Sequence, residues 1–143
     1  MTTQSVTRFL KPQEEFYFTA LKELREGRKK THWMWYVLPQ LKGLGRSPTA
    51  IFYGLQDLAE AQDYYNHELL GARLIFTTGA LLVQETSDPT ALMGTPDDVK
   101  LWSSMTLFSL LPNQGTELFQ LVLDKYFRGR KDPVTLELLG IKP

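Results

Sequence analysis

Apolar residues recur at helical spacing along almost the whole chain. Ala20, Leu21 and Leu24 follow Phe16 on one side of a helix predicted from Pro12 to Gly27, because residues three or four apart share a helix face. The same spacing predicts helices over residues 55–66, 68–84, 95–112 and 118–129, and shorter ones over 48–54, 89–94 and 133–139.

The starts of several of these helices carry their own signal. A residue able to cap a helix stands directly before a proline at Ser47-Pro48, Asp88-Pro89, Thr95-Pro96 and Asp132-Pro133. The capping side chain accepts a hydrogen bond from the first turn, and proline suits the first helical position.

Strand signals are sparse. Only residues 32–38 form a dense aromatic and branched run, and no hairpin turn accompanies it. We therefore expect an all-α fold of seven or eight short helices. The 143 residues fit one compact domain over residues 1–143, since one core commonly occupies about 100–150 residues.

Charge and cysteine content exclude several classes of protein. The net charge is zero, so no general affinity for nucleic acid or membranes is expected. Basic residues outnumber acidic ones by seven to two within residues 22–46, which suits a small anionic metabolite as partner. The lack of Cys excludes disulfides and a Cys nucleophile. Without a visible signal peptide or an apolar run of about 20 residues, a soluble cytoplasmic protein is expected; the oligomeric state stays open.

Residues 31–40, THWMWYVLPQ, are the first segment with candidate chemistry. Trp33 and Trp35 have flat rings that could stack on a base or sugar, and His32 and Gln40 complete the candidate binding set. The alternative is an aromatic core with His32 hydrogen-bonded internally.

Residues 42–48, KGLGRSP, lead into a predicted helix. Gly43 and Gly45 would let backbone amides approach a ligand, while Lys42 and Arg46 add charge beside Ser47 at the helix start. These are components of a phosphate or carboxylate site, although the spacing matches neither a P-loop nor a dinucleotide fingerprint. An ordinary turn is the alternative.

The helix predicted from Thr95 carries two acids in its first turn. Asp97, Lys100 and Ser104 fall on one face at i, i+3 and i+7. Lys100 and Ser104 could bind a ligand, and Asp97 or Asp98 could act as general acid or base if desolvated. Alternatively, the acids only stabilise the helix start and the serines allow close packing.

Arg73 is the one basic residue in the acidic stretch 57–98. It is explained either by an ion pair with Glu68 or a neighbouring acid, or by a ligand phosphate. His32 and His67 are 35 positions apart, which is weak evidence for a metal site, so neither a metal nor a cofactor is expected.

Four segments carry a resemblance to a bacterial family: HWMWYVLPQLKGLGRSPTA, YYNHELLGARL, KLWSSMTLF and LDKYFRGRKDPVTLELLG. Over residues 9–139 the chain resembles the family called domain of unknown function 1810, which implies a compact helical fold and no settled activity. The chain departs from the family pattern at Glu68 and Met93, where proline and phenylalanine are familiar. The label calpastatin that such sequences carry does not fit, because that inhibitor is a disordered charged chain.

A more distant resemblance is to NADAR-type N-glycosidases, and it rests on the aromatic segment and on the acid, Lys100 and Met105 of the late helix. It implies an enzyme that cleaves the N-glycosidic bond of a phosphorylated nucleoside or ADP-ribose-like compound. A tryptophan would stack on the base, residues 42–46 would hold phosphate, and Asp97 or Asp98 would be the acid/base. The alternative is a non-catalytic module that binds a small anion, a metabolite or a protein.

Overall fold

The computed structural model describes residues 6–142, and within this range the regular structure is helical apart from one isolated bridge. The elements in chain order are η1 Val6–Phe9, α2 Leu10–Arg25, α3 Met34–Val37, α4 Pro48–Tyr53, α5 Leu58–Asn66, α6 Glu68–Leu82, α7 Pro89–Met93, α8 Asp97–Ser109, α9 Glu117–Phe127 and α10 Pro133–Leu138. The all-α prediction is confirmed. The strand-like run contributes the single helical turn α3.

Several predicted helix starts are confirmed by capping contacts. Ser47 accepts a hydrogen bond from the Ala50 amide at 3.1 Å, and Asp88 caps α7 in the same way. Helix α8 differs from the prediction, because Pro96 rather than Thr95 occupies its N-cap and no side chain caps it.

The helix predicted from Leu55 begins three residues later, and the difference positions the site. Asp57 caps α5 by accepting from the Glu60 amide at 2.9 Å. Leu55 instead forms an isolated parallel bridge with Leu41, and its amide donates to the Gln40 carbonyl at 2.9 Å. The bridge ties the glycine-containing segment after α3 to the connection between α4 and α5.

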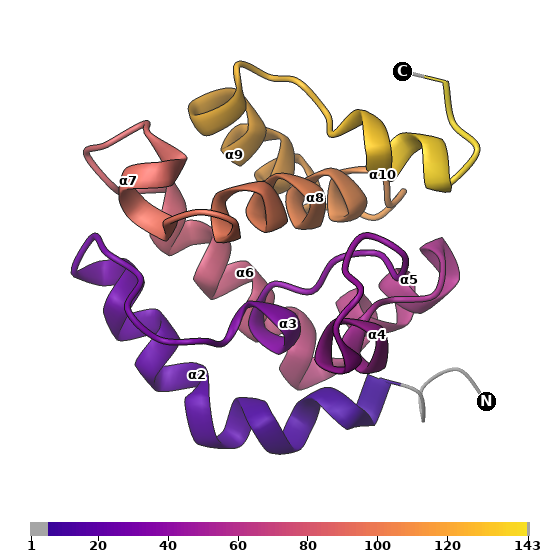
Figure 1. Ribbon diagram of the computed structural model, residues 1–143, viewed down its shortest axis with the longest axis horizontal. Helices are drawn as coiled ribbons and strands as arrows, with labels where there is room; N and C mark the ends of the chain where they lie inside the picture. Colours follow the sequence, from indigo (N-terminus) through magenta and orange to yellow (C-terminus); the bar gives the residue numbers. More distant parts are fainter. Residues whose placement is uncertain (1–5, 143) are drawn as a thin grey trace.

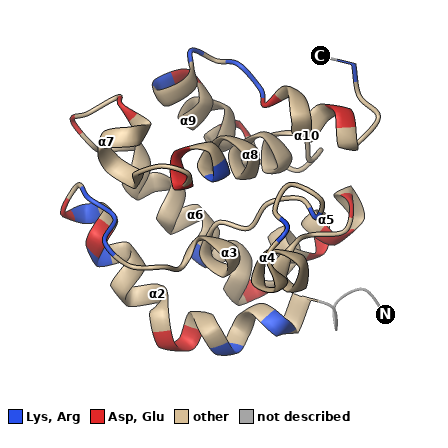
Figure 2. Cartoon of the chain, in the orientation of Figure 1, with Lys and Arg blue, Asp and Glu red and all other residues tan. Residues whose placement is uncertain are grey.

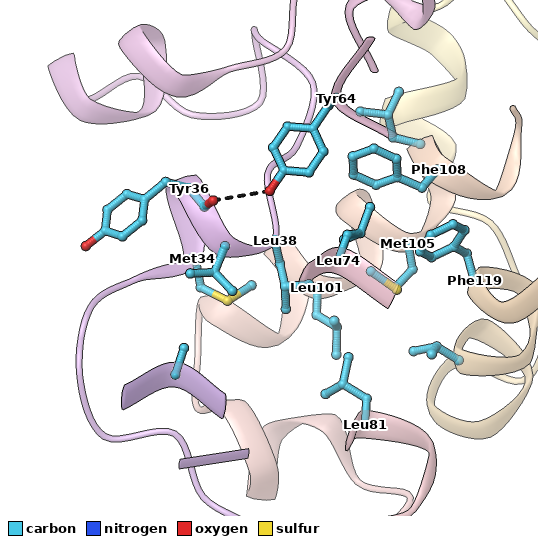
Figure 3. Close-up of a cluster of buried hydrophobic side chains, with 14 of the residues drawn as sticks. Met34, Tyr36, Leu38, Tyr64, Leu74, Leu81, Leu101, Met105, Phe108 and Phe119 are labelled. Atoms are coloured by element: carbon cyan, nitrogen blue, oxygen red, sulfur yellow. Dashed lines mark hydrogen bonds between the residues drawn. The ribbon is translucent and has the colours of Figure 1, made fainter. Parts of the chain in front are cut away.

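Helix α8 lies at the centre of the helices, packed against α3, α5, α7, α9 and α10 (Figure 1). Its Phe108 ring lies 5.6 Å from the rings of both Tyr64 on α5 and Phe119 on α9. Figure 3 shows these side chains with Met105 and Leu74 in one buried cluster. The core therefore joins elements from both halves of the chain.

Helix α2 buries most of the predicted face, since Ala20, Leu21 and Leu24 are buried. Phe16, expected on the buried side, is 36% exposed, whereas Gln13 is buried. The Gln13 amide donates to the Tyr36 carbonyl at 2.6 Å and to the Tyr64 hydroxyl at 2.7 Å, so a polar residue fills a core position by satisfying buried groups. Within residues 6–142, no helix combines the length and apolarity of a membrane span.

Candidate functional site

A chain of charged and aromatic contacts brings four of the predicted site residues together. Asp97 at the start of α8 lies 2.7 Å from the Lys29 ammonium and 3.6 Å from that of Lys100. Lys29 lies over the ring of Trp33 at 4.8 Å, and Lys100 over that of Trp35 at 5.0 Å. We call these five residues the Asp97 network. Both oxygens of Asp97 contact ammonium groups in it.

The two tryptophans of the network differ in what they can offer a ligand. Trp33 is fully buried, and its indole N–H donates to Glu23 at 2.9 Å. Trp35 is half-buried beside Lys100. Of the two rings predicted to stack on a base, only that of Trp35 has an exposed surface in this structure.

A pocket of about 400 Å³ lies beside this network, between α8, α10 and the segment after α3. Its wall is formed by Gln40, Leu44, Gly45, Pro96, Val99, Lys100, Ser103, Asp132 and Val134. We call it the α8–α10 pocket; Figure 1 shows the two helices side by side. Lys100 belongs both to its wall and to the Asp97 network, so Gln40, Gly45 and Lys100 of the predicted binding set meet here.

Local geometry explains both glycines of the turn that borders the pocket. Gly43 has φ +106°, a left-handed conformation that favours glycine. A Cβ on Gly45 would lie 2.5 Å from that of Ala50. Lys42 and Arg46 are exposed on this turn. The α4 helix that follows has six residues, and the Ser47 side chain accepts from the Ala50 amide in its first turn.

Asp132 is a buried carboxylate in the pocket wall that sequence reasoning assigned to capping alone. One oxygen accepts from the Val134 amide at 3.2 Å, as a cap does. The other accepts from the Ser103 hydroxyl at 2.8 Å and the Thr135 hydroxyl at 2.7 Å. Within residues 6–142 it forms no ion pair. Nothing in the spacing of Asp132 and Ser103, which are 29 residues apart, predicts this contact.

Asp98, Ser104 and His32 belong neither to the lining of this pocket nor to the Asp97 network. Asp98 accepts hydrogen bonds from the Thr90 hydroxyl at 2.7 Å and the Thr95 hydroxyl at 3.2 Å, which join α7 to α8. Within residues 6–142 the hydroxyl of the buried Ser104 has no hydrogen-bond partner, and His32 is exposed. The neighbouring Ser103 lines the pocket where Ser104 was expected.

Arg73 forms no ion pair with Glu68 or another acid among the described residues. Its guanidinium lies 4.8 Å over the Tyr17 ring and donates to Gln13 at 3.5 Å, with no carboxylate within 4.0 Å. The described part of the chain also contains no cluster of three His, Cys, Asp or Glu side chains able to hold a metal.

Comparison with known proteins identifies a family and a solved structure that match almost the whole chain. The model of the family described as protein of unknown function DUF1810 matches residues 3–139. The crystal structure of the conserved hypothetical protein Rv1873 from Mycobacterium tuberculosis is 44% identical, with a TM-score of 0.91, over 96% of this chain and 97% of that one. No curated protein matches the chain.

Proposed function

The chain belongs to the DUF1810 family of proteins of unknown function, and on this premise we propose that its α8–α10 pocket binds a small phosphorylated sugar or nucleoside of the ADP-ribose kind. One observation carries the proposal: Lys100 and Asp132 line the same pocket of about 400 Å³. That volume lies in the range of pockets that hold small ligands.

The opposite charges of these two residues narrow the ligand class. The Lys100 ammonium can bind a phosphate oxygen, whereas the Asp132 carboxylate repels a bare anion but can accept a further hydrogen bond beside those from Val134, Ser103 and Thr135. A phosphorylated sugar supplies both, with its phosphate at Lys100 and its hydroxyl groups at Asp132. Gln40, which also lines the pocket, adds an amide that both donates and accepts.

The surroundings of Lys100 support this orientation. Lys42 and Arg46 are exposed on the glycine turn that borders the pocket, so phosphate at this end meets further positive charge. The half-buried ring of Trp35, beside Lys100, gives a base a surface on which to stack. Asp97 then acts as a positioning residue, because its carboxylate contacts the Lys100 ammonium.

A second candidate function, cleavage of an N-glycosidic bond, is favoured by the burial of Asp132. Its side chain is held by two hydroxyl donors in a residue only 4% exposed. In such a reaction the C1′–N bond breaks, its electron pair leaves with the base, and water adds to C1′ with loss of a proton. We assign Asp132 to stabilise the positive charge at C1′ and to accept that proton, by analogy with glycoside hydrolysis. Asp97 and Asp98 are the alternative carboxylates.

Binding is tested by the thermal stability of the protein with ADP-ribose, ribose 5-phosphate and unphosphorylated ribose. We expect the two phosphorylated compounds to raise the Tm by several degrees at saturation and ribose to leave it unchanged, because a ligand that binds only the folded state stabilises it. Lys100→Ala should abolish the shift. Lys11→Ala, at an exposed position on α2, is the matched control. No shift with any compound, or the same shift in the Lys100 variant, would contradict the proposal.

Catalysis is tested separately by chromatography of the base released from nicotinamide and adenine ribosides carrying 5′-phosphate. We expect Asp132→Asn to lower turnover at least a hundredfold, while the phosphate contact at Lys100 keeps part of the thermal shift. Asp57→Asn removes a carboxylate from the N-cap of α5, outside the pocket, and should leave turnover unchanged. Binding without turnover in the unaltered protein would leave the non-catalytic binding function standing and refute the enzymatic one.

A further inference from the structure

A second, larger cavity of about 530 Å³ lies on the other side of the segment that joins α9 to α10. Trp102, Leu136 and Ile141 contribute apolar surface, and Arg130, Lys131 and Lys142 contribute charge. We infer that this C-terminal pocket binds a small aromatic anion, and the inference does not depend on the function proposed for the α8–α10 pocket.

The apolar wall of the C-terminal pocket is built around a fixed indole. Trp102 stacks on Phe127 with ring centroids 5.7 Å apart and an angle of 15° between the rings. Its indole N–H donates to the Arg130 carbonyl at 2.8 Å. Since that donor is occupied, Trp102 offers the pocket a flat apolar surface held in one orientation.

The charges at the C-terminal pocket are of one sign. Three of its lining residues are Arg or Lys, and none is Asp or Glu. Within residues 6–142, none of these three cations forms an ion pair, although Lys131 donates to the Gln120 side chain. Figure 2 shows the basic residues along the connection from α9 to α10 and at the C-terminal end. An anion placed here would relieve repulsion among the three cations.

A ligand that fits the C-terminal pocket therefore needs both an aromatic ring and a negative charge. A planar ring of the ligand can stack against Trp102. A carboxylate, sulfonate or phosphate group on that ring can then bind the Arg130 guanidinium or the Lys142 ammonium. The α8–α10 pocket differs because its wall contains a carboxylate. The segment 130–134 divides the two cavities: residues 130, 131 and 133 line one, and residues 132 and 134 line the other.

The aromatic anion 1-anilinonaphthalene-8-sulfonate and its uncharged analogue N-phenyl-1-naphthylamine provide a matched pair of fluorescent probes. We expect the sulfonate to bind the folded protein in a one-to-one ratio and more tightly than the neutral analogue. The double charge reversal Arg130→Glu and Lys142→Glu should weaken binding of the sulfonate at least tenfold and binding of the neutral probe less than twofold. The same reversal at Lys11 and Lys22, exposed on α2, should change neither.

Binding at the expected place is tested by the indole N–H signals in an NMR spectrum of the 15N-labelled protein. Trp102→Phe identifies the Trp102 signal by its loss, and that signal should move on titration with the sulfonate while those of Trp33 and Trp35 stay in place. Equal weakening by both pairs of charge reversals, or a Trp102 signal that does not move, would overturn the inference.

Discussion

Glu23 shows how one side chain acquires a role that its residue type does not predict. Burial alone would raise the pKa of its carboxyl, but hydrogen bonds from the Thr31 hydroxyl, the Lys30 amide, the Trp33 indole and the Thr31 amide lower it to about 2. The distances of these bonds lie between 2.6 and 3.0 Å. One carboxylate on α2 therefore holds both the segment 30–31 and the largest buried ring of the core.

The lowered pKa of Glu23 makes the stability of the protein depend on pH. Because the folded pKa of about 2 lies below the ordinary value of 4.5, the ionised form favours folding above pH 4.5, and this stabilisation is lost as the pH falls from 4.5 towards 2. Glu23→Gln should reduce the free energy of unfolding at pH 7 by about 3 kcal/mol and flatten its dependence on pH in this window. Urea denaturation at a series of pH values measures both.

The control for this prediction is Glu14→Gln, at an exposed position on the same helix. Its free energy of unfolding should match that of the unaltered protein within about 0.5 kcal/mol and keep the same pH dependence. A Glu23 variant as stable at pH 7 as the unaltered protein would show that the four hydrogen bonds do not stabilise the ionised form.

At the scale of elements, α6 carries two glycines whose surroundings differ. A Cβ on Gly71 would lie 2.1 Å from the Tyr65 carbonyl oxygen, at the end of α5, whereas a Cβ on Gly79 would meet nothing within 4 Å. A glycine inside a helix is typical of either close packing or a break. Helix α6 is continuous through both positions, and close packing explains only Gly71.

The two glycines therefore predict opposite effects of the same substitution. Gly71→Ala should lower the free energy of unfolding by about 1–3 kcal/mol, because the Tyr65 backbone must shift to admit the new carbon. Gly79→Ala should raise it by about 1 kcal/mol, because alanine costs a helix less conformational entropy than glycine. Chemical denaturation of both variants gives the two signs in one experiment, and the same sign for both would contradict the packing argument.

At the scale of the whole molecule, α8 connects the early and late helices through aromatic contacts. Phe108 lies 5.6 Å from the rings of Tyr64 and Phe119, and all three side chains are fully buried. Phe76 on α6 is by contrast 66% exposed. Hydrophobic residues of the same type therefore contribute unequally to holding the helices together.

Phe108→Ala should lower the free energy of unfolding by about 3–5 kcal/mol, because it removes a buried ring and leaves a cavity between three helices. Phe76→Ala should change it by less than about 0.5 kcal/mol. Thermal unfolding monitored by circular dichroism compares the two, and a similar loss in both variants would refute the central position assigned to Phe108.

The candidate site was predictable in its parts but not in its assembly. The aromatic segment, the glycine turn and the start of α8 each drew attention by residue type, and Gln40, Gly45 and Lys100 do line one pocket. The sequence did not predict that Asp132 and Ser103 line the pocket, because their contact depends on how α10 lies against α8. The sequence left Trp33 either stacked on a ligand or buried in the core, and its burial and its hydrogen bond to Glu23 favour the core.

The sequence by itself determined the all-α class and most helix boundaries, because helical spacing, capping residues and glycines act over a few residues. It also placed the chain in its family, through short residue patterns. Only the tertiary structure decided that Gln13 rather than Phe16 is buried on α2, which tryptophan is exposed, and which carboxylate enters the pocket. These outcomes depend on contacts between residues such as Glu23 and Trp33 or Ser103 and Asp132, whose energies arise only when separate helices pack together.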